Sequence, residues 1–314
     1  MATDLEKKLA HNKRIENGVL VPLFEQYHKE FHSDHWDSDD IDYLHDLMMR
    51  IAEREKLREL GPVFSPSGLG GCMRQTFLNK NHRKLEIPRK LRKKIETHYY
   101  FENGSWLHLK IQVKLYKLHK AGELELLGTE IGVAGKRGDN RGTLDAVFKR
   151  DRVFGVDIKG WNVRDFMGLA RGDCPLAAQI QLANYVILGN VDRNSLPRIE
   201  AGIILAENKA GPVAGFPAAV AEFEIPLEPM KAIVRSRLES LRSHEEAGTI
   251  PKAECQSTTQ TDFKDCAFRD YCKEDVERNA RRQKRRAQDR NADRRAPKVA
   301  TPVRSDRARR DRRT

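Results

Sequence analysis

The stretch GTLDAVFKRDRVFGVDIKG, residues 142–160, predicts two β-strands joined by a charged turn. Side chains alternate along a strand, so Asp157 and Lys159 lie on one face while Val156 and Ile158 lie on the other. This pattern fits the exposed edge of a hairpin, where opposite charges form weak pairs. It also fits a site in which Asp145, on the preceding strand, and Asp157 bind a hard divalent cation through oxygen.

The segments around this hairpin predict an α/β fold. Apolar residues at helical spacing indicate helices, and short apolar runs bounded by turn residues indicate further strands. A segment punctuated by proline and glycine, 62–80, ends in a short helical run. The order of elements predicts a mixed central sheet flanked by helices. The expected helices are 24–31, 39–60, 87–122, 174–190 and 226–248, and the expected strands outside the hairpin are 123–135, 198–208 and 218–227.

Composition limits the kind of protein. A chain of 314 residues holds one large domain or two small ones, and 39% hydrophobic residues suffice for a core. The chain contains no apolar run of the roughly 20 residues needed to span a bilayer, and its N-terminus is charged rather than signal-like. We therefore expect a soluble, cytoplasmic protein. Five cysteines, an odd number, indicate thiolate ligands or buried thiols rather than a disulfide framework.

The excess positive charge lies at the C-terminus. The net charge is +12, and residues 278–314 contain sixteen Lys and Arg against four Asp, which leaves 42 basic and 42 acidic residues in 1–277. This tail has too few large apolar residues to fold as a domain, so we expect it to be largely disordered, with its first part continuing a solvated helix. It is either a solubilising end or an arm that neutralises phosphates, and the density of arginine favours the arm.

Two further residue pairs accompany the hairpin. In ENGSWLHLKI, His108 follows Gly104 by four positions on a predicted helix. A lone histidine on such a helix is more often structural than a ligand. In AAQIQLANYVILG, Gln181 and Tyr185 are four positions apart and share one helix face, as polar pairs on surface helices commonly do.

Taken together, the motifs G-x-x-x-H, G-x-x-D, D-x-K and Q-x-x-x-Y resemble those of the PD-(D/E)xK nuclease superfamily, and within it the RecB-like exonucleases. The resemblance spans about 65–275 and departs from the family at Asp157, where many members have glutamate. It implies a restriction-endonuclease-like core, with an N-terminal helical region 1–64, a nuclease domain 65–277 and a basic tail 278–314. The residues that match are Gly104, His108, Gly142, Asp145, Asp157, Lys159, Gln181 and Tyr185.

The resemblance implies a metal-dependent exonuclease of DNA recombination, repair or phage DNA processing. Asp145 and Asp157 would hold Mg²⁺ or Mn²⁺ with the Ile158 carbonyl and His108, and Lys159 would orient and help deprotonate the attacking water. Gln181 and Tyr185 would position the DNA, either a single strand or a duplex with an end. Three alternatives stay open: an endonuclease, a CRISPR spacer-processing nuclease, and a non-catalytic DNA-binding protein. A recombination or CRISPR adaptation protein is the partner expected, and no membrane is expected.

The cysteines are similar to a second pattern. RecB-like nucleases of the AddB type, and CRISPR-associated exonucleases like them, hold a 4Fe-4S cluster with one upstream and three downstream cysteines. Here Cys72 lies upstream, and Cys255, Cys266 and Cys272 lie downstream, with the C-x5-C step of the family in CAFRDYC. The ten residues between Cys255 and Cys266 replace the usual two, so Cys174 is the alternative ligand. A zinc site is the competing interpretation, although C-x2-C spacing is absent.

Overall fold

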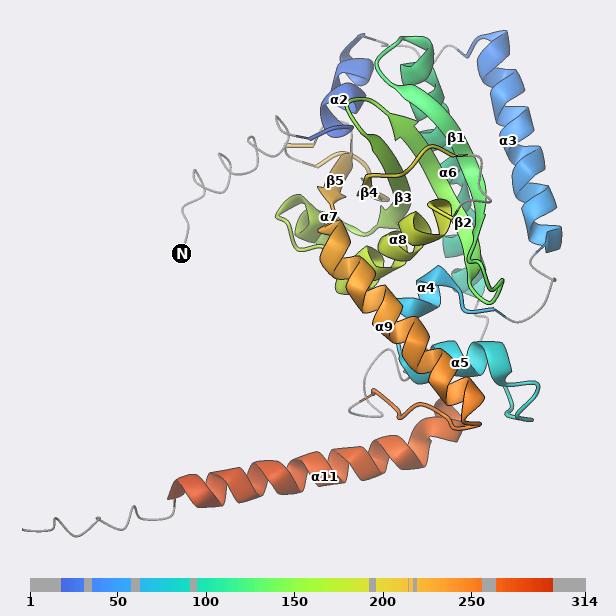
Figure 1. Cartoon of the computed structure of the whole chain (residues 1–314). Coiled ribbons are helices and arrows are strands. Elements are labelled where there is room, and N and C mark those ends of the chain that lie inside the picture. Colours follow the sequence, from blue (N-terminus) through green and yellow to red (C-terminus); the bar gives the residue numbers. More distant parts are fainter. Residues whose placement is uncertain are drawn as a thin grey trace, which may run out of the picture.

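The computed structural model describes most of the chain, and its helices and strands are labelled in Figure 1. The described residues are 18–30, 36–57, 63–90, 95–191, 196–213, 215–216, 219–255 and 264–295.

Five strands form one mixed sheet in the order β1-β2-β3-β4-β5 (Figure 1). β1 (Glu125–Ala134), β2 (Arg141–Lys149) and β3 (Val153–Trp161) are antiparallel neighbours, and the last two form the predicted hairpin. β4 (Ala201–Asn208) pairs with β3 in parallel, and β5 (Val220–Glu224) pairs with β4 antiparallel. The predicted mixed sheet is confirmed.

Helices cover both faces of this sheet. On one face lie α2 (Val21–Glu30) and α6 (Ile95–Lys120), with α3 (Ser38–Leu57) packed against α6 and β1. The other face is covered by α7 (Val163–Ala170) and α8 (Leu176–Gly189); α4 (Pro66–Leu69) and α9 (Leu227–Glu246) pack on α8, and α5 (Met73–Asn81) packs on α4 and α9. The result is three layers, with a hydrophobic core on each side of the sheet.

The burial of the strands explains their sequences. β4 is buried along its whole length, which is why it is a continuous apolar run. On β3, Val156 and Ile158 lie in the core next to α2 and α6, whereas Lys159 reaches α8 on the opposite side. The two-faced pattern predicted for this strand is therefore confirmed.

Two elements differ from the sequence-based expectation. The helix expected at 87–122 begins at Ile95, since residues 87–90 are not helical. No element was expected directly after β3, yet α7 starts there because the Asn162 side chain accepts a hydrogen bond from the Asp165 backbone N–H and caps the helix. This short helix brings the chain from the end of β3 toward the start of α8.

The basic tail begins as helix. α11 (Arg269–Arg295) is rooted in the core through Cys272 and Val276 and then runs away from the sheet (Figure 1). The expected helical continuation of the first part of the tail is confirmed, while residues 296–314 lie outside the described residues. The chain divisions at 64 and 277 remain predictions. Within the described part of the chain, none of the helices combines the length and apolar character needed to cross a membrane.

Candidate active site

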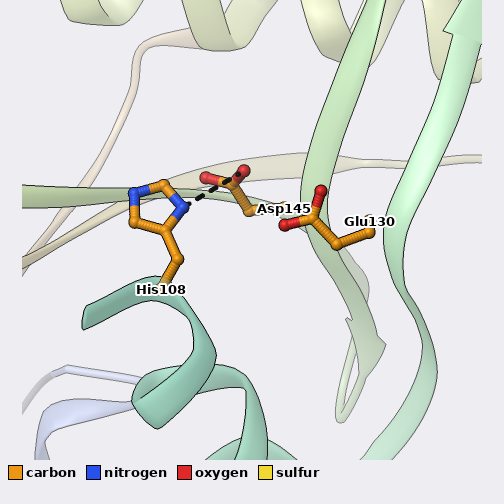
Figure 2. Close-up of side chains that lie close together, drawn as sticks. All are labelled: His108, Glu130 and Asp145. Carbon is orange, nitrogen blue, oxygen red and sulfur yellow. Dashed lines mark ion pairs between the residues drawn. The ribbon is translucent and has the colours of Figure 1, made fainter. Parts of the chain in front are cut away.

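Three potential metal ligands meet beside the middle of β1 and β2. His108 comes from α6, Glu130 from β1 and Asp145 from β2, and one ligand atom of each lies within 4.8 Å of the others. Figure 2 shows the three side chains pointing toward one another, and His108 Nδ1 lies 3.6 Å from Asp145 Oδ1. Carboxylate oxygens are ligands that Mg²⁺ and Mn²⁺ prefer, whereas an imidazole is a ligand of transition-metal ions.

Glu130 is a member of this group that the sequence reasoning missed. Thr129 pairs with Ala146 and Ile131 with Leu144, so the register sets Glu130 opposite Asp145. The backbone of Glu130 has φ of 52°, a left-handed conformation that costs a non-glycine residue about 1–3 kcal/mol. Such strain is common where a side chain has to point at a functional site, and here it accompanies a carboxylate directed at His108 and Asp145.

Gln112 of α6 forms hydrogen bonds with both Glu130 and Asp145 and so holds them in position. It follows His108 by one helical turn and is fully buried. Its Nε2 donates to Glu130 Oε1 at 3.0 Å and to the Asp145 carbonyl at 2.9 Å. One face of α6 therefore supplies a candidate ligand and also orients the carboxylate and the strand opposite it.

The remaining candidate residues form a connected chain. Asp145 Oδ2 accepts a hydrogen bond from the Ile158 backbone N–H at 2.6 Å. Lys159 Nζ lies 2.9 Å from Asp157 Oδ2 and donates to Gln181 Oε1 at 3.1 Å. Gln181 Nε2 in turn lies 3.3 Å from the Tyr185 hydroxyl. The structure thus brings the D-x-K and Q-x-x-x-Y residues together beside Asp145.

The electrostatics of the carboxylates favour a cation. Burial raises the pKa of Asp157 to about 6; Lys159 opposes this rise, and the Asp145 carboxylate adds to it. Burial acts against the charged form of Asp145, but His108, the Ile158 N–H and Lys159 together outweigh it and lower the pKa of Asp145. Burial likewise acts against the charged form of His108, but Asp145, Asp157 and Glu130 together outweigh it and raise the pKa of His108. A cation between these groups would stabilise both carboxylates in the charged form.

Asp157 is suited to such a cation. Its side chain is 3% exposed, and Oδ2 makes the ion pair with Lys159 but no hydrogen bond within the described chain. Buried carboxylates in proteins are ion-paired or coordinate metals, so Asp157 is chemically able to serve both Lys159 and a metal ion. The residues present therefore fit a divalent cation.

The two motif glycines have different structural roles. A Cβ on Gly142 would lie 2.7 Å from the Tyr185 ring and 2.9 Å from Pro66, so only glycine lets both approach β2. A Cβ on Gly104 would meet no atom within 4 Å, so nothing in the structure explains that glycine.

A second cluster lies on the α5 and α11 side of the protein. We define the cysteine site as Cys72, Cys255, Cys266 and Cys272. Burial raises the pKa of Cys266, with Cys272 and Cys72 adding to the rise; burial also raises the pKa of Cys272, where Arg74 opposes the rise and Cys72 adds to it. Cys72, Cys266 and Cys272 are thus close enough to interact electrostatically.

The surroundings of the cysteine site hold a buried cation. Arg74, 7% exposed, donates to Cys272 Sγ at 3.8 Å and to Asp275 Oδ2 at 2.7 Å. Cys255 follows Glu254, whose Oε1 accepts from the Met73 backbone N–H at 3.2 Å, next to Cys72.

Cys174 lies elsewhere. Burial raises the pKa of its thiol to about 12, with Asp157 adding to the rise and Lys159 opposing it. It therefore lies within electrostatic reach of Asp157 and Lys159, beside the candidate active site.

Comparisons with known proteins find remote similarity to solved structures. No protein-family model matches the sequence, and no curated protein matches it. The crystal structure of SSO0001 is similar with a TM-score of 0.40 and 17% identity, over 82% of this chain and 98% of that one. An alkaline exonuclease (LHK-Exo) from Laribacter hongkongensis is similar with a TM-score of 0.39 and 11% identity, over 59% of this chain and 90% of that one. Likeness this remote establishes neither a shared fold nor a family nor an activity for this protein.

Proposed function

We propose that the protein is a metal-dependent deoxyribonuclease that hydrolyses phosphodiester bonds. The observation that carries this proposal is the position of the Lys159 ammonium, ion-paired with Asp157 beside the His108, Glu130 and Asp145 group. A cluster of cation ligands next to a lysine supplies what phosphodiester hydrolysis needs: a place for a cation, and a donor that faces water and phosphate. The resemblance of the motifs to RecB-like exonucleases supports action from a DNA end in recombination, repair or phage DNA processing.

In this mechanism Asp145, Asp157, His108 and the Ile158 carbonyl would hold Mg²⁺ or Mn²⁺, and Glu130 would join them. When bound, the cation would lower the pKa of a water and offset negative charge on the phosphate. Lys159, held between Asp157 and Gln181, orients the attacking water and offsets the negative charge that grows on the phosphate. Gln181 and Tyr185, on one face of α8, position the DNA strand.

The test is incubation of purified protein with end-labelled linear DNA and closed circular DNA, each with and without Mg²⁺ or Mn²⁺. We expect linear DNA to be degraded only with the metal and circular DNA to persist. Cleavage of the circle would favour the endonuclease, and no cleavage of either DNA with metal would leave a DNA-binding protein without catalysis.

We further propose that the cysteine site binds a 4Fe-4S cluster with a structural role. Four thiolates ligate such clusters, and the proximity of three of these thiols supports the proposal. Arg74 adds a buried positive charge beside Cys272, which favours the thiolate form that a ligand needs. Cys72 and Cys272 are far apart in sequence, so a shared cluster would close a very long loop and stabilise the fold.

Protein purified without oxygen is expected to be brown, with broad absorption in the blue. Cys272→Ala should remove the colour and lower Tm by about 5 °C or more, since each 1 kcal/mol shifts Tm by roughly 2–4 °C in a domain of this size. Cys174→Ala is the matched control and should keep the colour. Zinc in place of iron in anaerobic material would overturn the cluster proposal and support the zinc site.

A further inference from the structure

A short segment links the candidate active site to the cysteine site. We define the strap as residues Ser65–Cys72, which include α4. Just before it, the Phe64 backbone N–H donates to the Asp139 carbonyl at 2.8 Å, at the turn between β1 and β2. At its other end, Cys72 is the N-cap residue of α5 and belongs to the cysteine site. The strap therefore runs from the turn between β1, which carries Glu130, and β2, which carries Asp145, to one of the four thiols of the cysteine site.

The backbone of the strap is in van der Waals contact with the backbone of α8 at Gly70. A Cβ added to Gly70 would lie 2.3 Å from the Ala177 carbonyl oxygen and 2.8 Å from Ala177 Cα, so backbone meets backbone there. Pro66 and the Tyr185 ring both lie over Gly142. Because α8 carries Gln181, which accepts from Lys159, the position of the strap sets the position of a neighbour of the candidate catalytic lysine.

Side chains from two other helices hold the strap. Arg237 of α9 donates through Nη1 to the Leu69 carbonyl at 2.6 Å and to the Gly71 carbonyl at 2.8 Å. Thr76 of α5 donates to the Gly68 carbonyl at 2.6 Å. The strap is thus fixed from the side of the molecule where the cysteine site lies.

We propose that the strap transmits the order of the cysteine site to α8, so that Gly70 is a positioning residue for Gln181 and Lys159. When the cysteine site is intact, α5 and the strap hold α8 against β2. When it is disrupted, Cys72 and the strap loosen, and Gln181 no longer holds Lys159 in place. The catalytic consequence rests on the proposed function, whereas the mechanical coupling does not.

Two adjacent glycines provide a matched test. Gly70→Ala places a methyl group against the Ala177 backbone, whereas a Cβ on Gly71 would come no closer than 3.6 Å to its nearest neighbour, the Gly68 carbonyl oxygen. Neither glycine has a left-handed backbone, so an alanine is compatible with the backbone conformation at both positions. In hydrogen exchange, Gly70→Ala should speed exchange of the α8 amides by about tenfold or more, the kinetic equivalent of about 1.4 kcal/mol. Gly71→Ala should leave it unchanged.

Measurements of Mn²⁺ affinity and of DNA cleavage in Gly70→Ala distinguish the proposed loss of Lys159 positioning from simple unfolding of the protein. Mn²⁺ affinity should persist in Gly70→Ala, because the candidate ligands lie on α6, β1, β2 and β3 and none on α8. DNA cleavage should fall by about tenfold or more at unchanged metal affinity, since a displacement of about 1 Å can be that costly. If Gly70→Ala does not fold, Arg237→Gln tests the same link, and it should speed α8 exchange while the fold persists.

The cysteine site is tested in the same way. Cys272→Ala should also speed α8 exchange, and combining it with Gly70→Ala should add little to the larger single effect, because both act through one contact. Unchanged α8 exchange in Cys272→Ala, or fully additive effects, would overturn the coupling. If the wild-type protein cleaves no DNA, the proposed function fails, yet the exchange data still decide whether the strap couples the two sites.

Discussion

Lys159→Ala and Asp145→Ala are each expected to abolish DNA cleavage, lowering kcat/KM by about 10³-fold or more, in the range seen when a charge-stabilising group is removed from an active site. Both side chains lie at the centre of the site: Lys159 contacts Asp157 and Gln181, and Asp145 contacts His108 and the Ile158 backbone. Neither belongs to the hydrophobic cores, so the fold and DNA binding should be largely preserved. The measurement is the rate of release of end label from linear DNA with Mn²⁺.

Metal affinity distinguishes the two roles. Asp145→Ala removes a ligand and should weaken Mn²⁺ binding, whereas Lys159→Ala removes no ligand and should retain it. Lys149→Ala is the matched control, because Lys149 is an exposed residue at the end of β2, next to the turn into β3. Near-normal cleavage by Lys159→Ala or Asp145→Ala would contradict the assignment of the active site.

The arrangement of the hairpin could be predicted because it depends on local rules. Alternation of side chains along a strand placed Asp157 and Lys159 together, and the short charged turn set the two strands side by side. The antiparallel register pairs Ala146 with Val156, and one residue beyond that pair the Asp145 carboxylate accepts a hydrogen bond from the Ile158 backbone N–H of β3. Both facts follow from a few neighbouring residues.

Glu130 could not be predicted in this way. Its place in the site depends on which residue of β1 faces Asp145 and on a left-handed backbone at a residue other than glycine. Register between strands separated by a turn and a bulge is a property of the assembled sheet rather than of a sequence window. Gln112 did carry a signal, because it follows His108 by four positions and so lies on the same face of α6.

The glycines illustrate the same limit. Gly104 and Gly142 were equivalent as motif positions, yet only Gly142 is enclosed, between Tyr185 and Pro66. That enclosure depends on α4 and α8 meeting over β2. The sequence contains the residues of this contact about forty and seventy-five positions apart, and only the fold brings them together.

Removing residues 278–314 is expected to weaken DNA binding strongly, by about 10³-fold at low salt, and to flatten its dependence on salt. The tail holds the whole net charge of +12, whereas residues 1–277 are balanced. Val276 is fully buried and Glu277 follows it, so a truncation after Glu277 keeps the root of α11 in the core. Catalysis per bound substrate should survive, because Asp145, Asp157 and Lys159 remain.

The slope of log affinity against log salt concentration decides whether the tail is a phosphate-binding arm. Each phosphate neutralised by the tail adds roughly 0.7 to 0.9 to the slope of log affinity against log salt, so several contacts would change the slope by several units. A second truncation, after Arg295, keeps the helical part, with nine basic and two acidic residues in 278–295, and removes seven basic and two acidic residues beyond it. If the tail neutralises phosphate along its length, the slope should fall in two comparable steps. A tail that only keeps the protein soluble, or that binds an acidic protein, would leave all three slopes equal, and that result would end the proposal of a phosphate-binding arm.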